Sequence, residues 1–128
     1  MPARVPRPTE AELAILRVLW EQGPSTVRQV HETLSGDRPT GYTTTLKLLQ
    51  IMTEKGLVRR DDRDRTHVFT ARASEDQTQR QLTKDLLDRA FGGSAAKLVM
   101  HALSSRQASA EELSQIRRLL DDYERGKR

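Results

Sequence analysis

Apolar residues recur at the spacing of an α-helix along most of this chain, and only one short stretch departs from it. The helical stretches lie at about residues 10–22, from after Ser25 to Leu34, 42–55, 75–91, 95–104 and 110–124. A capping box, which is a hydroxyl residue followed three positions later by Glu or Gln, begins three of these stretches, at Thr9, Ser74 and Ser109. The pattern therefore predicts a mainly α-helical chain.

The pattern changes after Gly56, a residue type that favours the end of a helix. Residues 57–60 and 66–70 are rich in β-forming types, and the polar residues 61–65 between them are typical of a turn. Three helices followed by a small β-hairpin are the order of a winged helix-turn-helix, which places its third helix in a DNA major groove. We therefore expect a winged helix-turn-helix DNA-binding domain with a short N-terminal arm over residues 1–72, and a three-helix dimerisation domain over 73–128.

The helix expected at about residues 42–55 has a polar face that suits DNA. Its apolar residues point on average towards Leu49 and Met52, and Thr43, Lys47, Gln50 and Glu54 lie opposite. Thr, Lys and Gln can contact base edges. Tyr42 and Thr44 flank the first turn, where hydroxyl and amide groups can hold a phosphate. An ordinary amphipathic surface helix would explain this face alone, but the hairpin that follows favours DNA.

The hairpin carries Arg59, Arg60, Arg63 and Arg65, and its tip also carries three aspartates. Arg63 and Arg65 at the tip could reach the DNA backbone or the minor groove. A solvated turn of mixed charge is the other interpretation. The net charge of +4 suits a polyanionic partner without proving one.

The apolar content of 35%, with 4% aromatic residues, is too small for either half of the chain to build a large core alone. We therefore expect the C-terminal helices to interlock with a second copy, because short helices rarely hold together alone in water. The apolar positions expected at this homodimer contact are Leu82, Leu86, Phe91, Leu98, Val99, Leu103, Leu113, Ile116 and Leu120.

Several kinds of function are excluded or disfavoured by residue types. Cysteine is absent, which excludes disulfides, thiolate metal sites and cysteine nucleophiles. The three histidines share no metal-ligand spacing, and no catalytic motif is present, so we expect no metal, no cofactor and no enzymatic activity. No apolar run reaches the roughly 18 residues that span a bilayer. The N-terminus also lacks the apolar core of a secretion signal, so we expect a cytoplasmic protein without membrane insertion.

Five segments together are typical of one family: residues 13–20, 23–30, 41–46, 55–60, and 91–94 followed by Leu98-Val99. On these segments the chain resembles the penicillinase-repressor (BlaI/MecI) family of bacterial winged-helix repressors. The resemblance implies a homodimer on palindromic operators, in promoters of antibiotic-resistance or related stress genes and often of the repressor's own operon. It also implies base contacts by Thr43, Thr44 and Lys47, and phosphate contacts by Thr26, Arg28 and Arg65.

The chain departs from the family pattern in three places. Ile51 stands where many members have a basic residue. In well-known members a membrane sensor-protease system triggers a cut at an Asn-Phe bond, and the matching position here is His101-Ala102. The cysteine cluster of the copper-responsive branch is absent. Two alternatives stay open: a winged-helix module that docks proteins, and a small-molecule-responsive regulator of the MarR type, although short helices and few aromatic residues argue against a ligand cavity.

Overall fold

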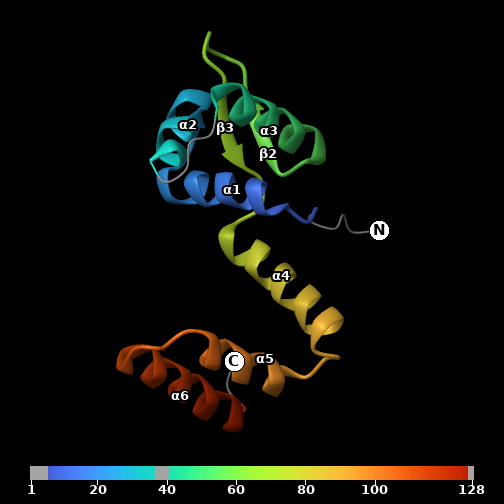
Figure 1. Cartoon of the computed structure of the whole chain (residues 1–128), viewed down its shortest axis with the longest axis vertical. Coiled ribbons are helices and arrows are strands. Elements are labelled where there is room, and N and C mark those ends of the chain that lie inside the picture. The colour runs from blue at the N-terminus through green and yellow to red at the C-terminus, as the bar shows by residue number, and fades with distance from the viewer. Residues whose placement is uncertain (1–5, 37–40, 127–128) are drawn as a thin grey trace. The chain divides into compact units, whose positions relative to one another are not determined.

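The computed structural model describes residues 6–36 and 41–126, and the chain divides into two units, Met1–Lys84 and Asp85–Arg128. The described elements are α1 (Glu10–Gln22), β1 (Ser25–Thr26), α2 (Val27–Ser35), α3 (Tyr42–Lys55), β2 (Val58–Asp61), β3 (Val68–Ala71), α4 (Glu75–Ala90), α5 (Ala95–Ser105) and α6 (Ala110–Glu124) (Figure 1). This order confirms the predicted mainly α fold with a small hairpin. Residues 1–5 of the expected arm and 37–40 of the expected loop lie outside the described residues. The domain boundary after residue 72 stays a prediction.

Local hydrogen bonds set the helix ends where the sequence predicts them. In the first capping box, the Thr9 Oγ1 atom accepts from the Glu12 amide at 3.2 Å and Glu12 Oε1 accepts from the Thr9 amide at 2.9 Å. Equivalent pairs form at Ser74 and Ser109. The end of α3 is a Schellman motif, in which Gly56 has a φ of 83° and the Leu57 amide donates to the Met52 carbonyl at 2.9 Å.

Two expectations for the hairpin and α2 are wrong in detail. Leu57 belongs to the Schellman motif and His67 to the turn, so the strands begin at Val58 and Val68 instead of 57 and 66. The sequence pattern also misses a third strand, because β1 has only two residues. It pairs antiparallel with β3 in a sheet of order β1-β3-β2, and Thr26, not Ser25, caps α2 through a box with Gln29.

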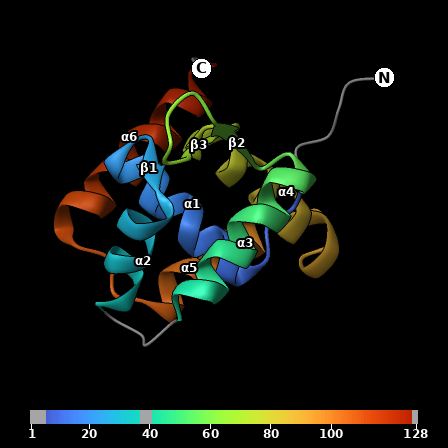
Figure 2. The same ribbon diagram turned by 90° about the horizontal axis from the view of Figure 1, so that it is seen from above.

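The core of the first unit lies where α1, α2 and α3 pack against one another and against the sheet (Figures 1 and 2). Its centre is closed to solvent because each helix turns one apolar stripe inward. The buried apolar residues are Ile15, Leu16, Val18, Leu19, Val27, Val30, Leu49, Met52, Leu57, Val58 and Phe69. Trp20 packs on this cluster, and its Nε1 atom donates to the Ala73 carbonyl at 3.0 Å.

The second unit has a different character. Within the described part of Asp85–Arg128, no residue is buried. The Ser94 side chain caps α5, and Gly92 and Gly93 between α4 and α5 both have positive φ angles, of 56° and 84°. Its large exposed apolar side chains are Leu86, Val99, Met100, Leu103, Leu119, Leu120 and Tyr123. Well-formed helices without a core of their own leave this apolar surface in contact with water.

We predict that Leu49→Ala lowers the free energy of unfolding by about 2–5 kcal/mol, because Leu49 is fully buried and its removal leaves a cavity. The matched control is Ile51→Ala on the same helix, where the side chain is 37% exposed. This change is expected to cost less than about 1 kcal/mol. Urea unfolding of the full chain at one fixed protein concentration measures both. Equal losses for the two variants would contradict the packing described here.

Candidate nucleic-acid interface

The outer face of α3 is polar and open to solvent. Thr43, Lys47, Gln50 and Glu54 are all exposed, whereas Leu49 and Met52 on the opposite side are fully buried. The burial of the apolar side fixes the rotation of the helix about its axis, so the polar residues must face outward. A hydroxyl, an ammonium and an amide group therefore line one accessible strip, as the sequence predicts.

The first turn of α3 differs from the starts of the neighbouring helices. Its N-cap is Gly41, which has no side chain to accept hydrogen bonds from the first amide groups. The side chains of Tyr42 and Thr44 are exposed beside this turn. The Tyr42 ring meets the His31 ring of α2 edge-on, with centroids 5.6 Å apart. The turn thus presents amide and hydroxyl donors, to which the helix dipole adds partial positive charge.

An ion pair fastens the other end of α3. The Lys55 Nζ atom lies 2.7 Å from Glu12 Oε1, and the Glu12 side chain is only 3% exposed. Burial raises the pKa of Glu12, but hydrogen bonds from Lys55 and Thr9 outweigh it, so the pKa lies below its usual value of 4.5. Because the Lys55 ammonium group is paired with Glu12, it is not among the cations that α3 offers to a partner.

The start of α2 and the wing, which is the hairpin of β2 and β3 with its connecting turn, belong to one sheet. Thr26 lies opposite Val68 in the β1–β3 pairing. Thr26 is half-buried and caps α2, and Arg28 in the first turn is exposed. The strand pairing therefore sets the position of two predicted phosphate contacts, Thr26 and Arg28, relative to the wing.

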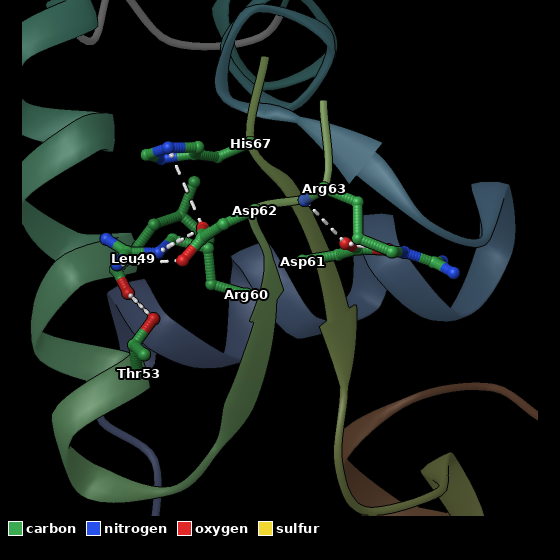
Figure 3. Close-up of polar contacts among 7 residues, drawn as sticks. All are labelled: Leu49, Thr53, Arg60, Asp61, Asp62, Arg63 and His67. Carbon is green, nitrogen blue, oxygen red and sulfur yellow. Dashed lines mark hydrogen bonds and ion pairs between the residues drawn. The ribbon is translucent and has the colours of Figure 1, made fainter. Parts of the chain in front are cut away.

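Arg60 of the wing faces α3. An open groove between the two elements is lined by Gln50, Thr53, Glu54 and Arg60. Figure 3 shows the Arg60 side chain pointing from β2 towards α3, where the Thr53 Oγ1 atom donates to the Leu49 carbonyl at 2.7 Å. The groove brings a guanidinium group beside Gln50, so the polar strip of α3 continues onto the wing.

Two of the four wing arginines are paired with wing carboxylates. Arg60 Nε lies 2.7 Å from Asp62 Oδ1, and Arg63 Nη2 lies 2.6 Å from Asp61 Oδ2. Hydrogen bonds from Arg63 lower the pKa of the Asp61 carboxyl to about 2. Arg63, predicted to reach the DNA backbone, thus already has a partner. Within the described residues, the guanidinium groups of Arg59 and Arg65 have no such partner.

The residues expected at a release site lie in the second unit. His101 and Ala102 are exposed in the middle of α5, and the His101 ring is 5.5 Å from the Phe91 ring. Of the described residues, no three His, Cys, Asp or Glu side chains gather as metal ligands would. Among the described helices, none has the length and apolar character to cross a bilayer.

The whole-chain pattern matches a known family. The profile described as "Penicillinase repressor" matches residues 8–122. A curated relative, "Transcriptional regulator BlaI" of Mycobacterium tuberculosis, is 34% identical over 126 residues, which cover 97% of this chain and 90% of that protein. The chain belongs to the penicillinase repressor family. It is therefore a transcriptional repressor of the BlaI type with a winged helix-turn-helix domain, and it is not an enzyme.

Two further relatives extend the comparison. "Penicillinase repressor" of Bacillus licheniformis is 22% identical over 125 residues, which cover 98% of both chains. The solution structure of the monomeric form of BlaI from that organism, in complex with the blaP half-operator, superposes with a TM-score of 0.51. It is 23% identical, and the match covers 58% of this chain and 90% of that one. At this identity the superposition shows a shared fold.

Sequence reasoning left Arg60 out of the candidate site, although a signal for it was available. Side chains alternate along a strand, so Arg60 shares the face of buried Val58, which is the face that meets the helices. The register agrees, because Arg60 lies opposite buried Phe69. No local signal could show that Glu12 and Lys55 pair, because 43 positions separate them.

We predict that Glu12→Gln lowers the free energy of unfolding by about 1–2 kcal/mol at neutral pH. The loss is no larger because Lys55 is partly exposed, and solvent screens its attraction to Glu12. The folded-state pKa of Glu12 lies below the unfolded one, so its stabilisation is present above pH 4.5 and disappears as the pH falls through the lowered pKa. The difference between the two proteins should therefore shrink in acid.

Urea unfolding at a series of pH values measures this difference. The matched control is Glu10→Gln, which changes an exposed carboxyl in the same helical turn and should alter stability by less than about 0.5 kcal/mol. A Glu12→Gln deficit that stays constant down to pH values below the lowered pKa would show that the ionised pair does not stabilise the fold.

Proposed function

We propose that this chain is a homodimeric repressor that binds palindromic operators, with α3 of each subunit in a major groove and the wing on the flanking backbone. The half-sites would lie about one helical turn apart. The observation that carries the proposal is the exposed strip of Thr43, Lys47 and Gln50 on a helix whose other side is fully buried. A helix held in this way presents the same groups to every DNA site that it meets.

The base contacts come from this strip. Lys47 can donate to guanine O6 and N7, Gln50 can bond the adenine edge, and the Thr43 methyl suits thymine. Tyr42 and Thr44, beside the uncapped first turn of α3, hold a phosphate. The relative from Bacillus licheniformis, studied in complex with a half-operator, supports the same use of the shared fold.

The remaining contacts position the domain on the backbone. Thr26 and Arg28 at the start of α2, and Arg65 at the tip of the wing, meet phosphates on the two sides of α3. Arg65 carries a guanidinium group without a partner among the described residues, so its charge is available. Arg63 contributes only when it exchanges Asp61 for a phosphate.

The apolar positions of α4, α5 and α6 support the homodimer. Of the apolar positions expected at the contact, Leu86, Val99, Leu103 and Leu120 are 40–56% exposed. The others are half-buried: Leu82, Phe91, Leu98, Leu113 and Ile116. Exposed apolar surface of this extent, most of it on α5 and α6, which contain no buried residue, suits a second copy of the chain, which would cover it.

The name of the family supports control of antibiotic-resistance genes, and we extend the proposal to related stress genes. Such a repressor works in the cytoplasm, where the chromosome lies. We also propose that a membrane sensor-protease system ends repression by a cut at His101-Ala102. Because this bond lies inside α5, the helix must open locally before a protease can reach it.

Gel-shift titration with the DNA upstream of the chain's own coding sequence tests the proposal, with a scrambled duplex of equal length as the reference. We expect tighter binding to the upstream DNA and a shift of two subunits per duplex. Equal binding to the two duplexes would refute an operator there, and a failure to bind either one in low salt would refute DNA binding altogether.

We predict that Lys47→Ala weakens operator binding by about 1–3 kcal/mol, because it removes a base contact. Binding to scrambled DNA should change much less. Lys84→Ala is the matched control, since it removes the same charge from an exposed position on α4. Fluorescence anisotropy with both duplexes measures the effect. An equal loss on both duplexes would make Lys47 a phosphate contact, and no loss on either would remove it from the interface.

We predict that Leu120→Glu weakens the homodimer more than about 100-fold, because a carboxylate must then enter an apolar contact. Sedimentation equilibrium should find the unchanged protein at twice its chain mass of 14.6 kDa and the variant near the single-chain mass. Ser114→Glu adds the same charge at an exposed polar position of α6 and should leave the dimer intact. A wild-type chain that stays monomeric at all concentrations would contradict the homodimer.

A further inference from the structure

Two of the four arginines of the wing, Arg60 and Arg63, are paired with carboxylates of the wing itself. In Figure 3, Asp62 lies beside Arg60 on the side of the hairpin that faces α3, and Asp61 lies beside Arg63 on the other side. Two contacts join the first pair, at 2.7 Å and 3.3 Å. In the second pair Asp61 accepts from the Arg63 amide at 3.0 Å and from its guanidinium at 2.6–3.0 Å.

The charges that remain are few. Arg59 and Arg65 have no ion-pair partner among the described residues, and neither has Asp64. The His67 Nε2 atom lies 3.6 Å from Asp62 Oδ1, so this carboxylate has a second cationic neighbour when the imidazole is protonated. Only two of the four wing arginines are thus free to attract the DNA backbone at long range.

A carboxylate and a phosphate compete for the same geometry on arginine. Both accept two parallel hydrogen bonds from the guanidinium fork. An arginine that is already paired gains less from a phosphate, because it must first give up its carboxylate. It also neutralises no phosphate while paired, so it releases no counterion and adds nothing to the salt dependence of binding.

We propose that Asp61 and Asp62 determine specificity by holding Arg63 and Arg60 back from sequence-independent phosphate contacts. The inference rests on the proposed binding of duplex DNA. Specificity is the difference between the affinity for the operator and the affinity for random DNA. When phosphate contacts that form on any sequence are weakened, random DNA binds less tightly, and the base contacts of α3 account for more of the remaining affinity. Asp62 has a second effect, because it lies beside Arg60, which lines the groove with Gln50, and repels any phosphate that approaches there.

The competing explanation is that the aspartates only keep a solvated turn soluble. In that case the removal of any one of them would raise DNA affinity by the same amount, through net charge alone. Asp64 separates the two explanations. It lies in the same turn and carries the same charge, but it holds no arginine.

The test compares the full-length wild-type chain with Asp61→Asn, Asp62→Asn and Asp64→Asn on a scrambled duplex over a series of salt concentrations. We expect Asp61→Asn and Asp62→Asn to bind the scrambled duplex about three- to tenfold more tightly than Asp64→Asn does. Their salt slopes should be steeper by about 1, as for one added phosphate contact. On the upstream DNA that carries the operator, the gain should be smaller, so the ratio of specific to random affinity falls.

A further variant tests whether the tighter binding of Asp62→Asn comes from Arg60. Arg60→Ala should change the salt slope of the wild-type chain little, because Arg60 is already held, but it should abolish the gain of Asp62→Asn. Asparagine keeps the shape of the side chain, and in Asp61→Asn its carbonyl can still accept from the Arg63 amide. Matching thermal unfolding curves for the wild-type chain and all of its variants would verify that the hairpin is intact.

Two outcomes would overturn the inference in distinguishable ways. If wild type binds the scrambled duplex and all three asparagine variants gain equally, net charge explains the result and the inference fails while the proposed function stands. If wild type binds no duplex even in low salt, the proposed function fails and the inference fails with it.

Discussion

The inward burial of one side of α3 is the constraint on which the rest of the DNA-binding unit depends. Leu49 and Met52 are fully enclosed by α1, α2 and the sheet, so a rotation of the helix would expose apolar surface and is unfavourable. The Glu12–Lys55 pair at the end of α3 restricts its position further. Because the inner side is fixed, the outer side presents Thr43, Lys47 and Gln50 in one constant orientation.

The sheet extends this constraint from α3 to the rest of the interface. Pairing of β1 with β3 joins the start of α2 to the wing, and pairing of β2 with β3 places Arg60 against the groove of α3. Groups from three separate parts of the chain thus share one rigid frame. Such a frame supports recognition, since a partner need not first order the side chains that it contacts.

Local signals in the sequence were sufficient for much of this architecture, and long-range pairing explains what they missed. Capping boxes and Gly56 set helix ends because their hydrogen bonds span only a few positions. The two-residue strand β1 has no periodicity to detect, and the Glu12–Lys55 pair joins positions 43 apart. The pairing of Arg63 with Asp61 is different, because the two residues are only two positions apart and an aspartate in a turn often accepts from the amide two residues on; the sequence analysis noted both charges without joining them.

The two units of the chain have the same kind of amphipathic helices but differ in whether those helices bury their apolar residues. The first buries its apolar residues within one subunit, whereas none of the described residues of Asp85–Arg128 is buried. If a second copy covers that surface, each winged helix holds its partner near the adjacent half-site, and the second contact becomes intramolecular. Operator affinity then depends on the dimer as strongly as on α3. Loss of the dimer contact would then release DNA while the side chains of α3 that face the bases stay in place. The part of the chain that controls binding and the part that contacts DNA can therefore be separate.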